Sequence, residues 1–108
     1  MNFDEYQKKA SEFRLPQATP EERVFGLFEE AGEVSGIFKR IIRGDYGIPP
    51  DPEVVGPKLH KELGDVLWYL SQIALDNDWT LESIAKENID KLESRRIRQQ
   101  LMGEGSSR

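Results

Sequence analysis

Cysteine is absent from this chain of 108 residues, and histidine occurs once, as His60. Disulfide bonds, thiolate metal sites and cysteine nucleophiles are therefore excluded, and a reducing cytoplasmic compartment is expected. A metal site would have to rely on oxygen ligands, which hard divalent cations prefer. Long apolar runs are also absent, and the N-terminus lacks a basic start, so we expect neither a membrane span nor a signal peptide.

The chain has fewer basic than acidic residues. Fifteen Lys and Arg residues against twenty Asp and Glu residues give a net charge of −5. This balance argues against a general affinity for nucleic acid or for an anionic membrane, so a small anionic ligand would need a local cationic patch or a metal. The length predicts one small domain that buries roughly 60 to 70% of its unfolded surface.

Capping residues, prolines and glycines divide the chain into helices. Asn2 with Glu5, and Thr19 with Glu22, have the spacing of capping boxes and predict two helix starts. Apolar residues then recur at helical spacing, which predicts an all-α fold. A third start is expected near Pro57, because proline inside a helix removes a hydrogen bond. The predicted helices cover about residues 3–13, 20–43, 57–78 and 81–101, with Asn2, Thr19 and Thr80 as caps.

Two further segments have the composition of irregular structure. Residues 44–52 are rich in proline and glycine and predict a loop. Residues 102–108 are rich in glycine and serine and predict a flexible tail after a single domain at 1–101.

Four carboxylates fall on two predicted helices at the same spacing. Glu30 and Glu33 lie three residues apart, as do Glu62 and Asp65. Each pair therefore shares one helix face, beside the apolar stripe, and antiparallel packing would bring the pairs together. Because crowded, partly desolvated acids repel one another, a divalent cation is the simplest compensating ligand.

The last predicted helix carries a complementary set. Asn88, Lys91 and Arg95 lie on one face, beside apolar residues. One amide and two cations on a face can bind phosphate oxygens, although such a trio is more often a solvated helix surface. Two alternatives to an enzyme acting on phosphates are a di-iron protein and an interaction module. A di-iron bundle requires more histidines than His60, whereas a non-catalytic helical interaction module would use the acids to bind cationic partners.

The segment 20–43 has more apolar surface than a small bundle buries. A homo-oligomer, either a dimer or a dimer of dimers, is therefore expected, and the family resemblance described next slightly favours the tetramer. The residues beyond the main apolar stripe are Phe25, Phe28, Ala31, Phe38, Ile41 and Ile42.

These blocks resemble the MazG-like nucleoside triphosphate pyrophosphohydrolases. The family's Glu-Glu-x-x-Glu motif is matched at residues 29–33, its Glu-x-x-Asp motif at 62–65, and its third block at 88–95. The resemblance covers residues 3–98 and implies a four-helix bundle that oligomerisation completes. It also implies hydrolysis of a nucleoside triphosphate between the α and β phosphates, with deoxynucleotides as the expected substrates.

The resemblance further implies roles for individual residues. Tyr69 would lie near the sugar or base, and Glu29 would orient a ligand or position the attacking water. Phe13 and Gln17 are weaker candidates for the base pocket, from the same or a neighbouring chain. The implied ligands of Mg²⁺, or of Mn²⁺ as its substitute, are Glu30, Glu33, Glu62 and Asp65. The implied phosphate-binding residues are Asn88, Lys91 and Arg95.

Overall fold

The computed structural model describes residues 1–102, and these residues form an all-α fold, as predicted. The predicted tail at 102–108 lies outside the described residues, except for Met102. None of the described helices combines the length and hydropathy that a membrane span requires. The elements are α1 (Phe3–Ala10), the short 3₁₀ helix η1 (Ser11–Phe13), α2 (Pro20–Arg43), α3 (Pro52–Asp76) and α4 (Leu81–Leu101).

The predicted capping boxes are confirmed. The Asn2 side chain accepts a hydrogen bond from the backbone of Glu5, and Thr19 accepts one from that of Glu22. At the other end of α2, Gly44 adopts a φ of 85°, a left-handed conformation that glycine tolerates best. The predicted bounds of α2 are therefore correct at both ends.

The predicted start of α3 near Pro57 is wrong. The helix begins five residues earlier at Pro52, where the Asp51 side chain accepts the backbone N–H of Glu53. Pro57 lies inside the helix, where its ring removes one hydrogen bond to the Glu53 carbonyl. Both residues are exposed, so water can solvate that carbonyl and the helix continues. It ends at Asp76, two residues before the predicted end.

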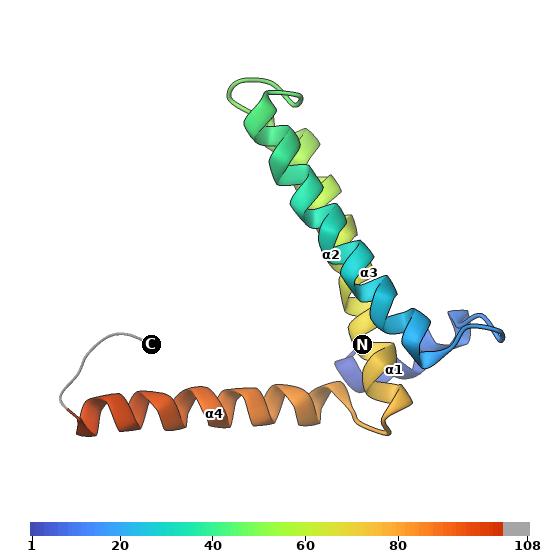
Figure 1. The fold of residues 1–108 in the computed structure, drawn as a ribbon, viewed down its shortest axis with the longest axis vertical. Coiled ribbons are helices and arrows are strands. Elements are labelled where there is room, and N and C mark those ends of the chain that lie inside the picture. Colours follow the sequence, from blue (N-terminus) through green and yellow to red (C-terminus); the bar gives the residue numbers. More distant parts are fainter. Residues whose placement is uncertain (103–108) are drawn as a thin grey trace.

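The helices form a hairpin with a projecting arm (Figure 1). α2 and α3 pack antiparallel along much of their length, and α1 packs against the C-terminal part of α3. α4 contacts α1 at its base and then leads away from the hairpin. The helices of one chain therefore do not close a four-helix bundle by themselves.

A buried glutamine fixes the turn between α3 and α4. The Gln7 side-chain Nε2 donates to the backbone oxygens of Ser71 and Trp79, at 3.0 and 2.9 Å. Its Oε1 accepts the backbone N–H of Leu81 at 3.2 Å. The side chain thus joins the end of α3, the turn and the start of α4, and it sets the direction in which α4 leaves.

A second polar contact holds the base of the hairpin. Two Arg23 nitrogens donate to the two carboxylate oxygens of Asp76, both at 2.7 Å, and Arg14 also donates to this carboxylate. Hydrogen bonding from Arg23, reinforced by Arg14, lowers the pKa of Asp76 despite its burial. The contact ties the first turn of α2 to the last turn of α3.

We predict that Asp76→Ala lowers the free energy of unfolding by about 3 kcal/mol or more, because it leaves a buried guanidinium unpaired. The side chains of Arg23 and Asp76 are only 9% and 10% exposed. Asp90→Ala is the matched control, since it removes only an exposed pair with Lys86 and should change stability by about 0.5 kcal/mol or less. Urea unfolding at one protein concentration measures both. Equal midpoints for the two variants would contradict the structural role of Asp76.

The lowered pKa of Asp76 also gives this contribution a pH dependence. The stabilisation is full above the unfolded-state pKa of about 3.9 and is lost as the pH falls through the lower folded-state value. The stability difference between the native protein and Asp76→Asn should therefore shrink below about pH 4. A difference that stays constant down to about pH 2 would show that the carboxylate charge is not what holds the two helices.

Candidate functional site

Three carboxylates converge where α2 and α3 face each other. One oxygen from each of Glu30, Glu62 and Asp65 lies within 4.8 Å of the other two. Glu30 comes from α2, and the other two come from successive turns of α3. All three residues are half-buried. We call these residues the acidic cluster.

The charges of the acidic cluster are poorly compensated. Burial, followed by the charges of Asp65 and Glu62, raises the pKa of Glu30 above its usual value. The only ion pair that the cluster makes among the described residues joins Glu62 to Lys61, at 3.6 Å, and the Lys61 side chain is largely exposed to solvent. Such a pair is screened by water and contributes little. The fold thus holds three acids together without an internal cation that balances them.

The other two predicted acids lie at the edge of the cluster. Glu33 is exposed and does not belong to the group whose oxygens converge. Glu29 is also exposed, and its charge contributes to the raised pKa of Glu30. The structure therefore brings together three of the four predicted metal ligands, and leaves Glu33 and Glu29 open to solvent one turn or less away.

Gly26 and Tyr69 form the next layer of the hairpin. A Cβ atom at Gly26 would overlap the ring of Tyr69, so glycine is needed for this close approach. Gly26 lies one helical turn before Glu30, and Tyr69 one turn after Asp65. The tyrosine ring is thereby placed on the same side of the hairpin as the acidic cluster.

A recess of about 480 Å³ opens beside this layer. Phe25, Trp68 and Tyr69 supply aromatic walls, and Glu29 lies at its edge toward the acidic cluster. The predicted pocket residues Phe13 and Gln17 do not line it, and both are exposed. We call this the aromatic recess. Its remaining lining residues are Leu15, Ala18, Glu22, Arg23 and Gly26.

The packing of Trp68 and Tyr6 beside the aromatic recess does not follow from the sequence pattern. Trp68 is half-buried, and its Nε1 donates to the Ala10 carbonyl at 3.1 Å, which fixes the indole against α1. Tyr6 on α1 is also close to the site. Burial and the charge of nearby Asp65 raise the pKa of its hydroxyl. Helical periodicity alone places Tyr6 on the apolar face of α1. No pattern in the sequence indicates which helix that face contacts.

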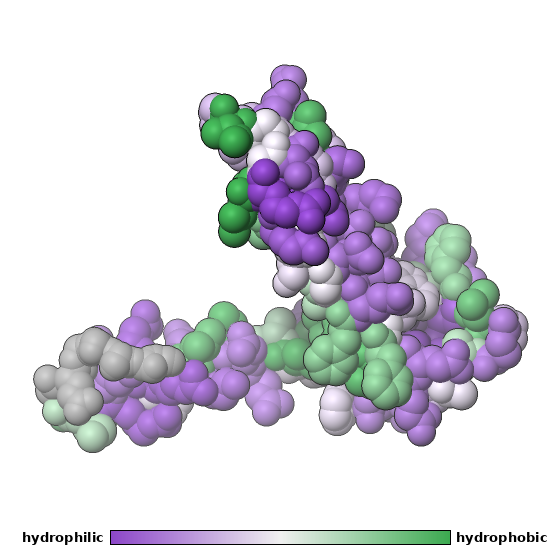
Figure 2. Space-filling view, turned by 45° about the horizontal axis from the view of Figure 1, so that its top comes forward, coloured by the Kyte–Doolittle hydropathy of each residue, from purple (hydrophilic) through white to green (hydrophobic). Residues whose placement is uncertain are grey.

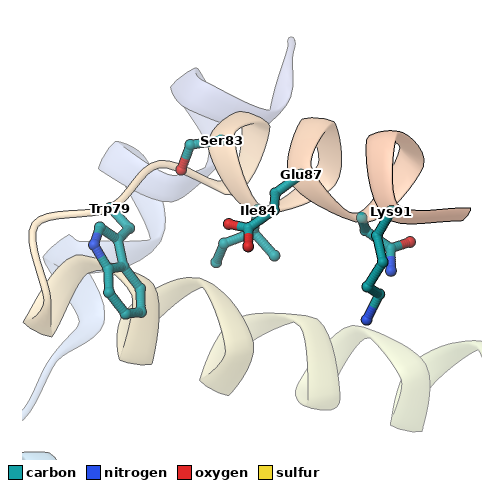
Figure 3. A pocket seen from close by; sticks show the side chains of 6 residues that line it. Trp79, Ser83, Ile84, Glu87 and Lys91 are labelled. Carbon is teal, nitrogen blue, oxygen red and sulfur yellow. The ribbon is translucent and has the colours of Figure 1, made fainter. Parts of the chain in front are cut away.

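The predicted phosphate-binding residues lie on the arm. Asn88 and Lys91 are exposed and line a shallow recess of about 330 Å³ together with Trp79 and Ile84 (Figure 3). Arg95 is half-buried one turn farther along α4. Among the described residues, neither Lys91 nor Arg95 takes part in an ion pair. One chain therefore does not join its basic residues to its own acidic cluster.

Comparison with known proteins identifies the family. A family model described as the MazG nucleotide pyrophosphohydrolase domain matches residues 18–98, which include α2, α3 and most of α4. The chain is also 37% identical over 83 residues to the Gene 37 protein of Mycobacterium phage L5, across 77% of this chain and 71% of the phage protein. No solved structure gives a significant match. The family match contains both the acidic cluster and the basic residues of the arm, and the chain belongs to the MazG nucleotide pyrophosphohydrolase family.

Proposed function

We propose that this protein is a divalent-metal-dependent pyrophosphohydrolase that cleaves nucleoside triphosphates, with deoxynucleotides preferred, between the α and β phosphates. The products are a nucleoside monophosphate and pyrophosphate. The observation that carries the proposal is the convergence of Glu30, Glu62 and Asp65 within 4.8 Å. Membership of the MazG family supports the reaction class.

The acidic cluster fits a hard divalent cation. Its donors are all carboxylate oxygens, which suit Mg²⁺ or Mn²⁺. The raised pKa of Glu30 reports repulsion and desolvation that a bound cation would relieve. Glu30, Glu62 and Asp65 would hold the ion, and exposed Glu33 is close enough in sequence to add a fourth oxygen. When bound, such an ion neutralises phosphate charge and favours attack by water at phosphorus.

The residues around the acidic cluster would bind the nucleoside, orient the attacking water and bind the phosphates. The aromatic recess begins one helical turn from the acids and has a size and lining suited to a nucleoside. Phe25, Trp68 and Tyr69 would contact the base and sugar there. Exposed Glu29, which lines the recess next to Glu30 in sequence, would orient a ligand or the attacking water. Asn88, Lys91 and Arg95 would bind phosphate oxygens and stabilise the charge on departing pyrophosphate.

We predict that pyrophosphate release from deoxynucleoside triphosphates requires Mg²⁺ or Mn²⁺ and stops in excess EDTA. Asp65→Asn should lower kcat/KM at least about 100-fold, because it removes a charged ligand and several kcal/mol of charge stabilisation. Glu12→Gln, at an exposed acid on η1, is the matched control and should retain native activity. A pyrophosphate assay over a panel of nucleotides measures each value. Native activity in chelator, or in Asp65→Asn, would refute the proposed metal site.

A second prediction uses stability rather than turnover. Because the folded state raises the pKa of Glu30, ionising this residue destabilises the fold as the pH rises through that value. Glu30→Gln should therefore raise the thermal midpoint of the metal-free protein at neutral pH. Addition of Mn²⁺ should raise the midpoint of the native protein and leave that of the variant nearly unchanged.

The matched control is Glu53→Gln, which alters an exposed acid in the first turn of α3. This variant should respond to Mn²⁺ as the native protein does. An equal metal response in Glu30→Gln would remove Glu30 from the set of ligands.

A further inference from the structure

The loop end of the hairpin is basic, although the chain as a whole is acidic. Residues 39–61, which comprise the end of α2, the loop at 44–51 and the first part of α3, contain five Lys or Arg residues and three acidic ones. The whole chain has a net charge of −5. Strongly hydrophilic side chains gather near this end of the hairpin, beside a few apolar ones, in the upper part of Figure 2. A basic region on an acidic protein favours an anionic ligand nearby.

Tyr46, in the loop, holds two of these cations on the hairpin. The Arg40 Nε donates to the Tyr46 hydroxyl at 2.9 Å. The Lys58 Nζ lies 5.8 Å from the centroid of the Tyr46 ring, which is within the range of a cation–π contact. Because Arg40 belongs to α2 and Lys58 to α3, the tyrosine brings one residue of each helix to the same level of the hairpin.

The Arg40 guanidinium turns back along α2 toward the acidic cluster. Its two terminal nitrogens lie 3.4 and 3.6 Å from the position of a Cβ atom at Gly36, one helical turn before Arg40. Long side chains on a helix lean toward its N-terminus, which explains this direction. Hydrogen bonding to Tyr46 and, more weakly, the charge of Glu33 raise the pKa of Arg40. The guanidinium therefore lies on the loop side of Glu33, about one helical turn away.

The terminal nitrogens of Arg40 are available to a ligand. Within residues 1–102, the side chain makes its only hydrogen bond from Nε, and it takes part in no ion pair. A guanidinium held at Nε presents its two terminal nitrogens as a fork, which suits phosphate oxygens. A guanidinium that served only to balance the acids would contact a carboxylate. Arg40 is instead held by the neutral hydroxyl of Tyr46, although both residues are half-buried.

Aromatic, acidic and basic groups follow one another along the hairpin, in the same order on both helices. Consecutive members are three, four or seven residues apart, so helical periodicity places each series on one face of its helix. The aromatic recess is therefore at one end of the acidic cluster, and Arg40 is at the other. The series on α2 is Gly26, Glu30, Glu33 and Arg40, and the series on antiparallel α3 is Tyr69, Asp65, Glu62 and Lys58.

We propose that Arg40 binds the β and γ phosphates of the nucleotide, so that the substrate lies along the hairpin with its base in the aromatic recess and its departing pyrophosphate beside the loop. The identity of the ligand rests on the proposed function. A phosphate chain that continues past the acidic cluster reaches the free fork of Arg40, whereas a nucleoside monophosphate is too short to do so. Tyr46 is a positioning residue, because it fixes the guanidinium through Nε.

Kinetics test this contact through its dependence on the number of phosphates. Arg40→Ala should lower kcat/KM for a deoxynucleoside triphosphate about 10- to 100-fold, because it removes a charge-assisted contact to phosphate. Inhibition by the matching monophosphate should not change. Arg40→Lys keeps the charge without the fork and should give an intermediate value. Lys39→Ala is the matched control, because it removes an exposed cation that points about 100° away around α2. Unchanged kcat/KM in Arg40→Ala, with an active native protein, overturns the proposal.

A double-mutant cycle tests the role of Tyr46. Tyr46→Phe removes only the hydroxyl and should lower kcat/KM about two- to tenfold. If Tyr46 acts through Arg40, Arg40→Ala/Tyr46→Phe should lose no more activity than Arg40→Ala alone. Losses that multiply in the double variant would show that Tyr46 acts independently and would overturn its positioning role.

Binding of inorganic pyrophosphate tests the same contact without turnover. In isothermal titration calorimetry with Mg²⁺ present, the native protein and Lys39→Ala should bind pyrophosphate equally, and Arg40→Ala should bind it about 10- to 100-fold more weakly. Equal affinity in the native protein and Arg40→Ala, or binding by neither, overturns the role of Arg40 and leaves the proposed function to the nucleotide assay. A native protein that hydrolyses no nucleotide but binds pyrophosphate through Arg40 overturns the proposed function and leaves the phosphate contact standing.

Discussion

Repulsion among three half-buried carboxylates is the constraint on which the rest of this structure depends. The antiparallel contact of α2 with α3 forces Glu30, Glu62 and Asp65 together, and the Gly26–Tyr69 contact keeps the helices close in the next layer. Holding these acids within 4.8 Å of one another costs electrostatic free energy. The arrangement is explained if a cation bound there offsets the repulsion.

The molecule separates this acidic centre from the positive charge that would complement it. The hairpin carries the carboxylates and the aromatic recess, whereas the arm carries Asn88, Lys91 and Arg95. Gln7 holds the two parts at a fixed relation through three hydrogen bonds.

Local chemistry made much of the fold predictable from the sequence. Asn2, Thr19 and Gly44 each satisfy or redirect nearby backbone groups, so helix ends follow from neighbouring residues alone. The predicted start of α3 near Pro57 was wrong for a related, local reason. The lost hydrogen bond is real, but the Asp51 cap six residues earlier and exposure to water let α3 begin before Pro57.

The site was predictable only in part. The three-residue spacing of the acids placed Glu30, Glu62 and Asp65 correctly on facing helices, because that spacing is a property of the helix. It could not show that Glu33 lies outside the convergent group, since that depends on how the two helices are rotated in contact. The roles of Gln7, Tyr6 and Trp68 depend on contacts with residues more than fifty positions away, which no local pattern encodes.

If the acidic cluster binds a divalent cation, titration with Mn²⁺ followed by electron paramagnetic resonance detects that binding directly. The signal of free Mn²⁺ should fall saturably with added native protein and recover when Mg²⁺ competes. A protein with both Glu62→Gln and Asp65→Asn should leave that signal unchanged. Equal binding of Mn²⁺ by the native protein and this double variant, or binding by neither, would contradict the account.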